Sequence, residues 1–186
     1  MIRINKVGLI WIFAWGCIFW LDIAFGLKEL FCCKGLNIIG TEYYRFFTGL
    51  LLHVNLFHIW ANMITMFFVC NFLNGKIKDT VLFAFSLIAG TLANFLFSMV
   101  SPQGYMIGGS PAIFALIGLI VVLQWKRKDL PRFKLGTWYG NWIVGYALFS
   151  NIPFFSKDFS TLIIHVIGFV VGLVFGMLVV LMKDHR

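Results

Sequence analysis

One serine and three histidines stand in apolar parts of the sequence, where polar side chains are uncommon. His53, His58 and His165 lie in or beside long apolar runs, and Ser110 opens another such run. Ionisable residues in apolar membrane segments are rare and usually functional. A serine hydroxyl becomes a nucleophile only when a base accepts its proton, and His165 is the imidazole placed to do so. The residues therefore predict nucleophilic catalysis by Ser110, with His165 as the general base.

Further side chains could stabilise the negative oxygen of an attacked carbonyl. His58 and Asn62 are one helical turn apart and face the same way, whereas His53 lies five residues before His58 and is expected in a loop. Hydrogen bonds from His58, Asn62 and the backbone around Gly109 would form an oxyanion hole. Asp158 is seven residues before His165, about 10 Å along a helix axis. We therefore expect a dyad and not a triad.

Other interpretations fit single residues. Ser110 followed by Pro111 is a common helix start, with serine as the N-cap and proline as the first helical residue. His53 and His58 could bind a metal, but they lack i, i+4 spacing and a neighbouring acid or cysteine ligand. We expect neither a metal nor a cofactor. A proton transporter could use His165, although Asp22 is the only acid along the predicted spans.

Two helices must position the predicted dyad. Phe114 and Gly118 follow Ser110 at i+4 and i+8, while Gly168 and Gly172 follow His165 at i+3 and i+7. Gly118 lies about 12 Å below Ser110, and Gly172 about 10.5 Å below His165, if both helices run the same way. Glycines on both faces let the two backbones approach closely. Ser110 and His165 are therefore expected to meet at one depth.

The composition excludes a water-soluble globule. Hydrophobic residues make up 61% of the 186 residues, and the chain has 15 Lys and Arg residues compared with 7 Asp and Glu residues. The basic residues are scattered between apolar runs, so we expect no nucleic-acid partner. A helix needs about 20 apolar residues to span a bilayer. We predict a single all-α integral membrane domain over 1–186 with six transmembrane helices, at 8–26, 56–74, 80–99, 110–125, 138–153 and 159–182.

Lys and Arg predict the orientation of these spans. Eleven of the basic residues fall before span one, after spans two, four and six, and four fall on the other side. Cytoplasmic segments carry the Lys and Arg excess, so both termini are expected in the cytoplasm, with spans two, four and six parallel. Span four covers about 15 residues, or about 22 Å, less than the roughly 30 Å hydrocarbon core. We therefore expect a wet hollow near Ser110, open to the outside.

Together these motifs resemble the rhomboid family of intramembrane serine proteases. The resemblance covers nearly the whole chain and is carried by Tyr44-Arg45, by His53, His58 and Asn62, by Gly108-Gly109-Ser110, and by His165-x-x-Gly168-x-x-x-Gly172. It implies a six-helix core, a Ser–His dyad in a water-filled cavity, and cleavage of transmembrane segments near their outer ends. It also implies a multi-pass protein of the cell membrane whose partners are the lipid bilayer and transmembrane protein substrates.

The resemblance assigns roles residue by residue. Ser110 would be the nucleophile and His165 the base, and His58 and Asn62 would line the oxyanion hole. Phe114 would take the place of an aromatic ring that packs on the base. The chain departs from the family pattern with Pro111 and Ala115 in place of glycines and Tyr44 in place of tryptophan. Pro111 leaves the N–H groups of Gly109 and Ser110 intact, so we expect activity. The alternative is a non-catalytic binder of transmembrane segments.

Overall fold

Helices occupy the six ranges predicted from the apolar runs. The structure is a computed structural model and describes residues 4–126, 135–152 and 159–184. The six helices are α1 Lys6–Phe25, α4 Leu56–Phe72, α5 Asp79–Val100, α6 Ser110–Lys126, α7 Trp138–Phe149 and α8 Ser160–Asp184. The largest difference is at α7, which ends four residues before the predicted boundary. Pro153 follows shortly in the sequence and disfavours helix at the residue before it.

Within the described residues, three helices are long and apolar enough to cross a bilayer. These are α1 with 20 residues, α5 with 22, and the 19 residues Ser160–Leu178 of α8. The apolar helices α4 and α6 have 17 residues each, about 25 Å. The count of six spans therefore stays a prediction, as does the cytoplasmic location of both termini.

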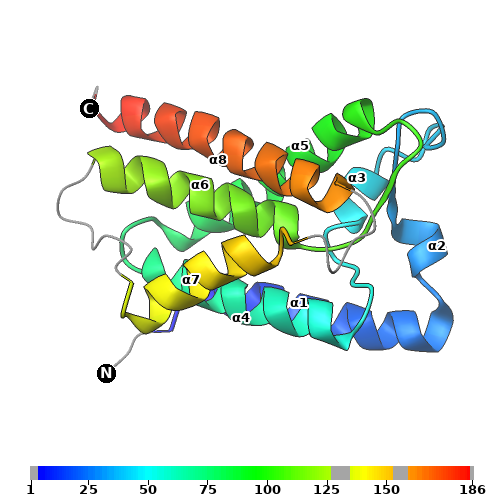
Figure 1. The fold of residues 1–186 in the computed structure, drawn as a ribbon, viewed down its shortest axis with the longest axis horizontal. Helices are drawn as coiled ribbons and strands as arrows, with labels where there is room; N and C mark the ends of the chain where they lie inside the picture. Colours follow the sequence, from blue (N-terminus) through cyan, green and yellow to red (C-terminus); the bar gives the residue numbers. More distant parts are fainter. Residues whose placement is uncertain (1–3, 127–134, 153–158, 185–186) are drawn as a thin grey trace.

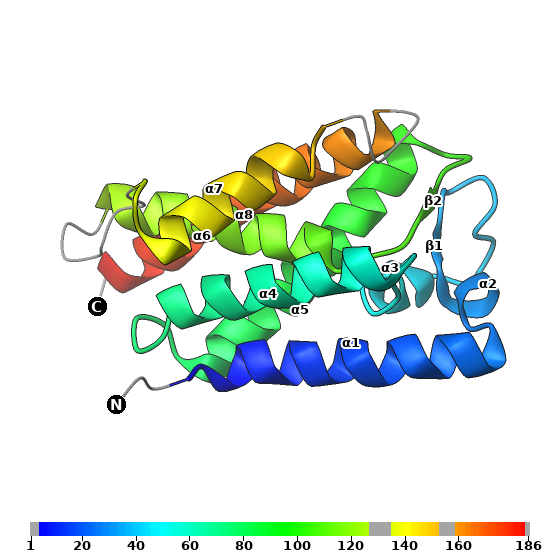
Figure 2. The same ribbon diagram turned by 60° about the horizontal axis from the view of Figure 1, so that its bottom comes forward.

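The helices alternate in direction. In Figures 1 and 2, α4, α6 and α8 run one way along the molecule, and α1, α5 and α7 run the opposite way. The start of α1 and the end of α8 lie at the same end of the bundle (Figure 1). The six-span prediction requires the parallel course of α4, α6 and α8, because these three helices would enter from one face.

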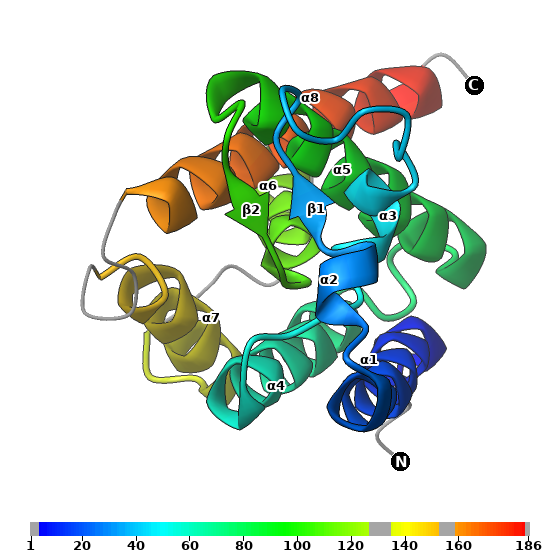
Figure 3. The ribbon, with the colours of Figure 1, turned by 90° about the vertical axis from the view of Figure 1, so that its right-hand side faces the viewer.

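Helix α6 is the central helix of the bundle. Viewed from the end in Figure 3, it lies behind the two strands, with α4, α5, α7 and α8 around it. Every residue from Ser110 to Ile120 is buried. The outer helices instead expose large apolar side chains, such as Phe13 on α1 at 74% and Val170 on α8 at 48%. Such an apolar outer surface suits lipid and not water.

Glycines set the contact between α6 and α8. A Cβ added at Gly118 would collide with the Phe169 carbonyl oxygen, and one added at Gly172 would collide with the Ala115 carbonyl oxygen. The two backbones are therefore in direct contact, where the glycine spacing predicts a close approach. This contact holds Ser110, at the start of α6, level with His165 in the second turn of α8.

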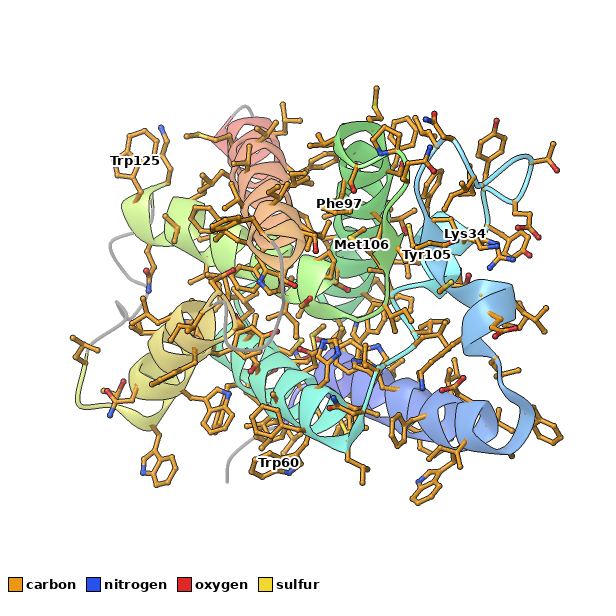
Figure 4. All side chains as sticks on the ribbon, turned by 45° about the vertical axis from the view of Figure 1, so that its right-hand side comes forward. Lys34, Trp60, Phe97, Tyr105, Met106 and Trp125 are labelled. Atoms are coloured by element: carbon orange, nitrogen blue, oxygen red, sulfur yellow. The ribbon has the colours of Figure 1, made fainter. Side chains whose placement is uncertain are left out.

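Residues 26–55 form a connecting segment between α1 and α4 that the all-α prediction missed in part. It contains the short helices α2 Lys28–Phe31 and α3 Arg45–Thr48, and the strand β1 Cys33–Lys34 pairs antiparallel with β2 Tyr105–Met106. Figure 4 shows Lys34, Tyr105 and Met106 at this end of the molecule, away from Trp125. A pairing of two residues per strand is too short to leave a periodic signal in the sequence. The strands connect this segment to the loop that leads into α6.

Arg45 is buried within this connecting segment and bonds several of its parts. Its side chain is 3% exposed, and its guanidinium donates to Glu42 Oε2 at 2.7 Å, to Glu29 O at 3.0 Å and to Cys32 O at 3.3 Å. The hydrogen bond from Arg45 lowers the pKa of the Glu42 carboxyl. Asn94 of α5 donates to Phe46 O at 2.8 Å. Arg45 thus joins parts of the segment to one another, and Asn94 attaches the segment to α5.

Candidate active site

The first turn of α6 and the second turn of α8 bring Ser110 and His165 into hydrogen-bond contact. Ser110 Oγ lies 2.9 Å from His165 Nε2. The Phe114 ring stacks on the imidazole of His165, with ring centroids 4.2 Å apart and ring planes 14° apart. An imidazole that stacks on an aromatic ring and has its Nε2 beside a hydroxyl can accept the hydroxyl proton without changing its orientation. The glycine contact between α6 and α8 is what makes this separation possible.

The site is closed in this conformation. Ser110 is 7% exposed and His165 4% exposed. The expectation of a hollow open to the outside near Ser110 is therefore wrong for the structure described here. The prediction used only the short length of α6, and helix length does not determine how the surroundings of Ser110 pack.

The start of α6 differs by one residue from the predicted capping pattern. The helix begins at Ser110, and Gly109 O accepts hydrogen bonds from Ala112 N at 3.1 Å and Ile113 N at 3.3 Å. Gly109 is therefore the capping residue, and the expectation of Ser110 as N-cap is wrong, since Ser110 is the first helical residue. Pro111 has no N–H to donate. The N–H groups of Gly109 and Ser110 precede the first intrahelical donor, Ala112.

Two glycines before Ser110 allow aromatic rings to lie against the loop. Gly108 has φ of 142°, and a Cβ there would meet the His58 ring. A Cβ at Gly109 would collide with the indole of Trp15 from α1. The Trp15 indole also donates to Leu50 O at 2.9 Å and meets the His53 ring edge-on at 5.1 Å. His58 and Trp15 thus both contact the segment that precedes the serine.

Asn62 and the two other histidines form a connected group beside this loop. Asn62 Nδ2 lies 3.0 Å from His53 Nε2, and the rings of His53 and His58 meet edge-on at 5.2 Å. His53 precedes α4, in the loop where the sequence predicted it. An amide nitrogen carries two hydrogens, and the contact with His53 uses one. Asn62 and His53 are each 1% exposed, so a negative oxygen near Asn62 would be little screened by water.

The sequence interpretation missed two polar residues of α7 and its C-terminal turn. The Tyr146 hydroxyl donates to Asn62 Oδ1 at 2.6 Å, and Asn151 Oδ1 lies 2.8 Å from His165 Nδ1. Both residues lie in the predicted range 138–153, but neither is an acid or an imidazole. The available signal was the presence of an amide in an apolar run. Asp158, the acid considered for a triad, lies outside the described residues.

Comparisons with known proteins identify the family of this chain. Residues 40–182 match the family model of the rhomboid domain. The chain is 24% identical over 187 aligned residues to a Bacillus subtilis (strain 168) protein named "Putative rhomboid protease YdcA", covering 96% of this chain and 87% of that protein. The matched range includes all of the candidate site residues except Trp15 of α1. The chain therefore belongs to the rhomboid family and is an integral membrane protein.

Proposed function

We propose that this chain is an intramembrane serine endopeptidase that cleaves transmembrane segments of other proteins near the outer face of the membrane. The observation that carries the proposal is the 2.9 Å separation between Ser110 Oγ and His165 Nε2. Rhomboid membership and the name of the Bacillus subtilis relative support the same reaction class. In this proposal Ser110 is the nucleophile, His165 the general base, and no cofactor takes part.

The first half of the reaction forms an acyl-enzyme. Ser110 Oγ attacks the carbonyl carbon of the scissile peptide bond while His165 Nε2 accepts the hydroxyl proton. The carbonyl oxygen becomes negative, and N–H groups of Asn62, His58, Gly109 and Ser110 are the donors available to it. His165 then gives the proton to the leaving nitrogen, and the C–N bond breaks.

The second half releases the new carboxylate. A water molecule attacks the acyl carbon while His165 accepts a proton from that water. His165 then gives the proton to Ser110 Oγ when the ester bond breaks. The stacked Phe114 ring supports the imidazole in one plane through both proton transfers. Because Ser110 is 7% exposed, substrate entry and water entry both require the site to open.

An intramembrane protease of this kind should prefer substrates with weak helical structure at the cleavage point. A helical peptide engages its carbonyl groups in its own hydrogen bonds, so the scissile bond must leave the helix before Ser110 can reach it. Transmembrane segments with glycine or proline near the outer end lose less helix stability when they unwind. We therefore propose such segments as the preferred substrates.

The test compares purified variants in detergent and in liposomes with a model transmembrane substrate. We expect cleavage by the wild type, and no cleavage by Ser110→Ala or His165→Ala. Ser98→Ala is the matched control, because Ser98 is also buried in a helix but donates to Phe95 O, away from the dyad. A fluorophosphonate probe should label Ser110 in the wild type and in Ser98→Ala, as read by mass spectrometry.

Equal cleavage by wild type and Ser110→Ala would reject the serine mechanism. Binding of the transmembrane substrate without cleavage, together with no labelling of Ser110, would favour the non-catalytic binder. Uptake of a solute that depends on pH, with no peptide products, would favour the transporter.

A further inference from the structure

The residue that follows α7 by two positions, Asn151, contacts the proposed base on the side opposite the serine. Its Oδ1 lies 2.8 Å from His165 Nδ1, and its Nδ2 donates to Ala147 O at 2.6 Å. Asn151 is half-buried. Both nitrogens of the His165 ring are thus engaged, one by Ser110 and the other by Asn151.

The carbonyl of Ala147 fixes the direction of this hydrogen-bond chain. A backbone carbonyl oxygen can only accept, so the Asn151 atom that faces Ala147 O is the amide nitrogen. The Asn151 oxygen must then face His165, and it too can only accept. His165 Nδ1 is therefore the nitrogen that carries the proton, and Nε2 presents a lone pair to the Ser110 hydroxyl.

The anchor in this chain is a consequence of how α7 ends. The last carbonyl groups of a helix have no intrahelical donor, and Ala147 O, in the last turn of α7, receives the Asn151 side chain instead. Asn151 N itself donates to Leu148 O at 3.2 Å, which curls the chain back over the helix end. The amide is held in one orientation by its own helix before it meets His165.

We infer that Asn151 is a positioning residue that sets the tautomer of His165 and so keeps Nε2 free to accept the Ser110 proton. The inference rests on the proposed function, and it deepens the dyad into a directed chain from Ala147 O through Asn151 and His165 to Ser110. A neutral imidazole with its proton on Nε2 cannot act as base toward Ser110. The amide of Asn151 disfavours that tautomer without adding a charge.

The experiment uses the full-length protein with Asn151→Leu and Asn151→Asp. Leucine has a similar size but no acceptor, whereas the aspartate keeps an oxygen for His165 Nδ1–H and loses the donor to Ala147. Asn71→Leu is the matched control, because Asn71 also donates from Nδ2 to the carbonyl four residues before it, Phe67 O, at the other end of α4. The readouts are the rate of fluorophosphonate labelling of Ser110, kcat and KM for a transmembrane substrate, and the ¹⁵N spectrum of the His165 ring.

We expect Asn151→Leu to lower the labelling rate and kcat at least about tenfold, a part of the roughly 10²- to 10⁴-fold that a positioned acid–base group contributes. KM should stay within about twofold, since no substrate contact is removed. Asn151→Asp should restore most of the rate, and Asn71→Leu should match the wild type. In the spectrum, assigned by comparison with His165→Ala, the wild-type ring should carry its proton on Nδ1, and Asn151→Leu should add a signal from the other tautomer.

Three outcomes would overturn the inference. They are a wild-type His165 ring protonated on Nε2 when neutral, an Asn151→Leu protein with wild-type labelling rate, and an Asn151→Asp protein as slow as Asn151→Leu. The first needs no variant, so it decides the question even if Asn151→Leu does not fold. If the wild type shows neither labelling nor cleavage while the tautomer still depends on Asn151, the proposed function fails and the hydrogen-bond chain stands.

Discussion

Helices α8 and α7 both reach the candidate site, but they pack in different ways. Helix α8 lies against α6 through glycines, with backbone touching backbone at Gly118 and Gly172. Helix α7 and its C-terminal turn contact α4 and α8 through side-chain hydrogen bonds, from Trp142 to Thr65, from Tyr146 to Asn62 and between Asn151 and His165. The first contact fixes how far apart Ser110 and His165 are. The second fixes how their neighbours are oriented.

The two helices also differ in what they bury. On α7, Trp138, Leu148 and Phe149 are 81%, 64% and 66% exposed, and among the side chains described on this helix Ile143 and Tyr146 are the large ones that are buried. Helix α7 is thus held by few apolar contacts and by polar bonds, which are individually modest in net free energy. A change on the α6–α8 side should alter distance and stability together, whereas a change at the α7-side residues that contact Asn62 or His165 should alter turnover with little loss of stability.

The largest effect is expected at Asn62, the residue through which α7 reaches the proposed oxyanion hole. Asn62→Ala should lower kcat by roughly 10²- to 10³-fold, as for the loss of one oxyanion donor, and should change KM little. Steady-state kinetics with a transmembrane substrate measures both constants. A rise in KM at unchanged kcat would assign Asn62 to substrate binding instead.

The α6–α8 side can be broken with a single methyl group. Gly172→Ala places a Cβ against the Ala115 carbonyl, so it should lower the free energy of unfolding by about 1–3 kcal/mol. Because it also displaces His165, it should lower kcat about 100-fold. Gly145→Ala on α7 is the control, because a Cβ there meets nothing within 4 Å; it should be neutral or slightly stabilising. Thermal unfolding in detergent and kcat are the measurements. Equal behaviour of the two variants would remove the distinction between the helices.

Removing one hydroxyl tests the α7 side. Tyr146→Phe deletes the donor to Asn62 and keeps the ring beside Phe114. It should raise the activation free energy by about 0.5–1.5 kcal/mol, the size of one net hydrogen bond, which lowers kcat roughly two- to twelvefold. The melting temperature should change little. Tyr43→Phe, at a tyrosine that is 61% exposed, should have no effect. A wild-type kcat in Tyr146→Phe would show that Asn62 keeps its orientation without this bond.

A bond on α7 farther from the dyad should matter less for turnover. Trp142→Phe removes the donor to Thr65 Oγ1, and a double-mutant cycle with Thr65→Val should give a coupling of about 0.5–1 kcal/mol in stability. We expect kcat within about twofold of the wild type, because neither residue touches the dyad or the oxyanion group. A fall in kcat as large as that of Tyr146→Phe would mean that the whole helix, and not single bonds, sets the site.

The smallest effect is expected at Glu42, in the connecting segment between α1 and α4. Its pKa is lowered in the folded state by the Arg45 hydrogen bond, so the ion pair contributes stability above the ordinary carboxyl pKa of about 4.3 and loses it as the pH falls through the lower folded value. Glu42→Gln should therefore melt slightly below the wild type at pH 7, and the difference should shrink at acid pH. A difference that grows in acid would contradict this sign.

The sequence predicts the parts of this molecule that depend on one helix at a time. Apolar runs bounded by charge predicted six helical ranges, and the glycine spacing on α6 and α8 predicted where the two backbones would touch. These signals are local and periodic. The placement of His53 in a loop before α4 follows from the same spacing argument.

The remaining features depend on how separate segments meet. The bonds of Tyr146 and Asn151 depend on how α7 is rotated about its axis, and α7 is apolar on most of its surface, so periodicity does not fix that rotation. The β1–β2 pair joins residues 33–34 to 105–106 through contacts too short to leave a pattern. The burial of Ser110 and His165 depends on tertiary packing, which no spacing rule describes.

Trp15 of α1 packs against the residue that precedes Ser110. Its indole fills the place where any side chain at position 109 would stand, yet α1 precedes residues 40–182, the range that matches the rhomboid domain. A chain trimmed to that range would keep Ser110 and His165 but lose the indole against which the loop before Ser110 packs. Helix α1 precedes this loop in the sequence, so the indole is synthesised before the loop that packs against it.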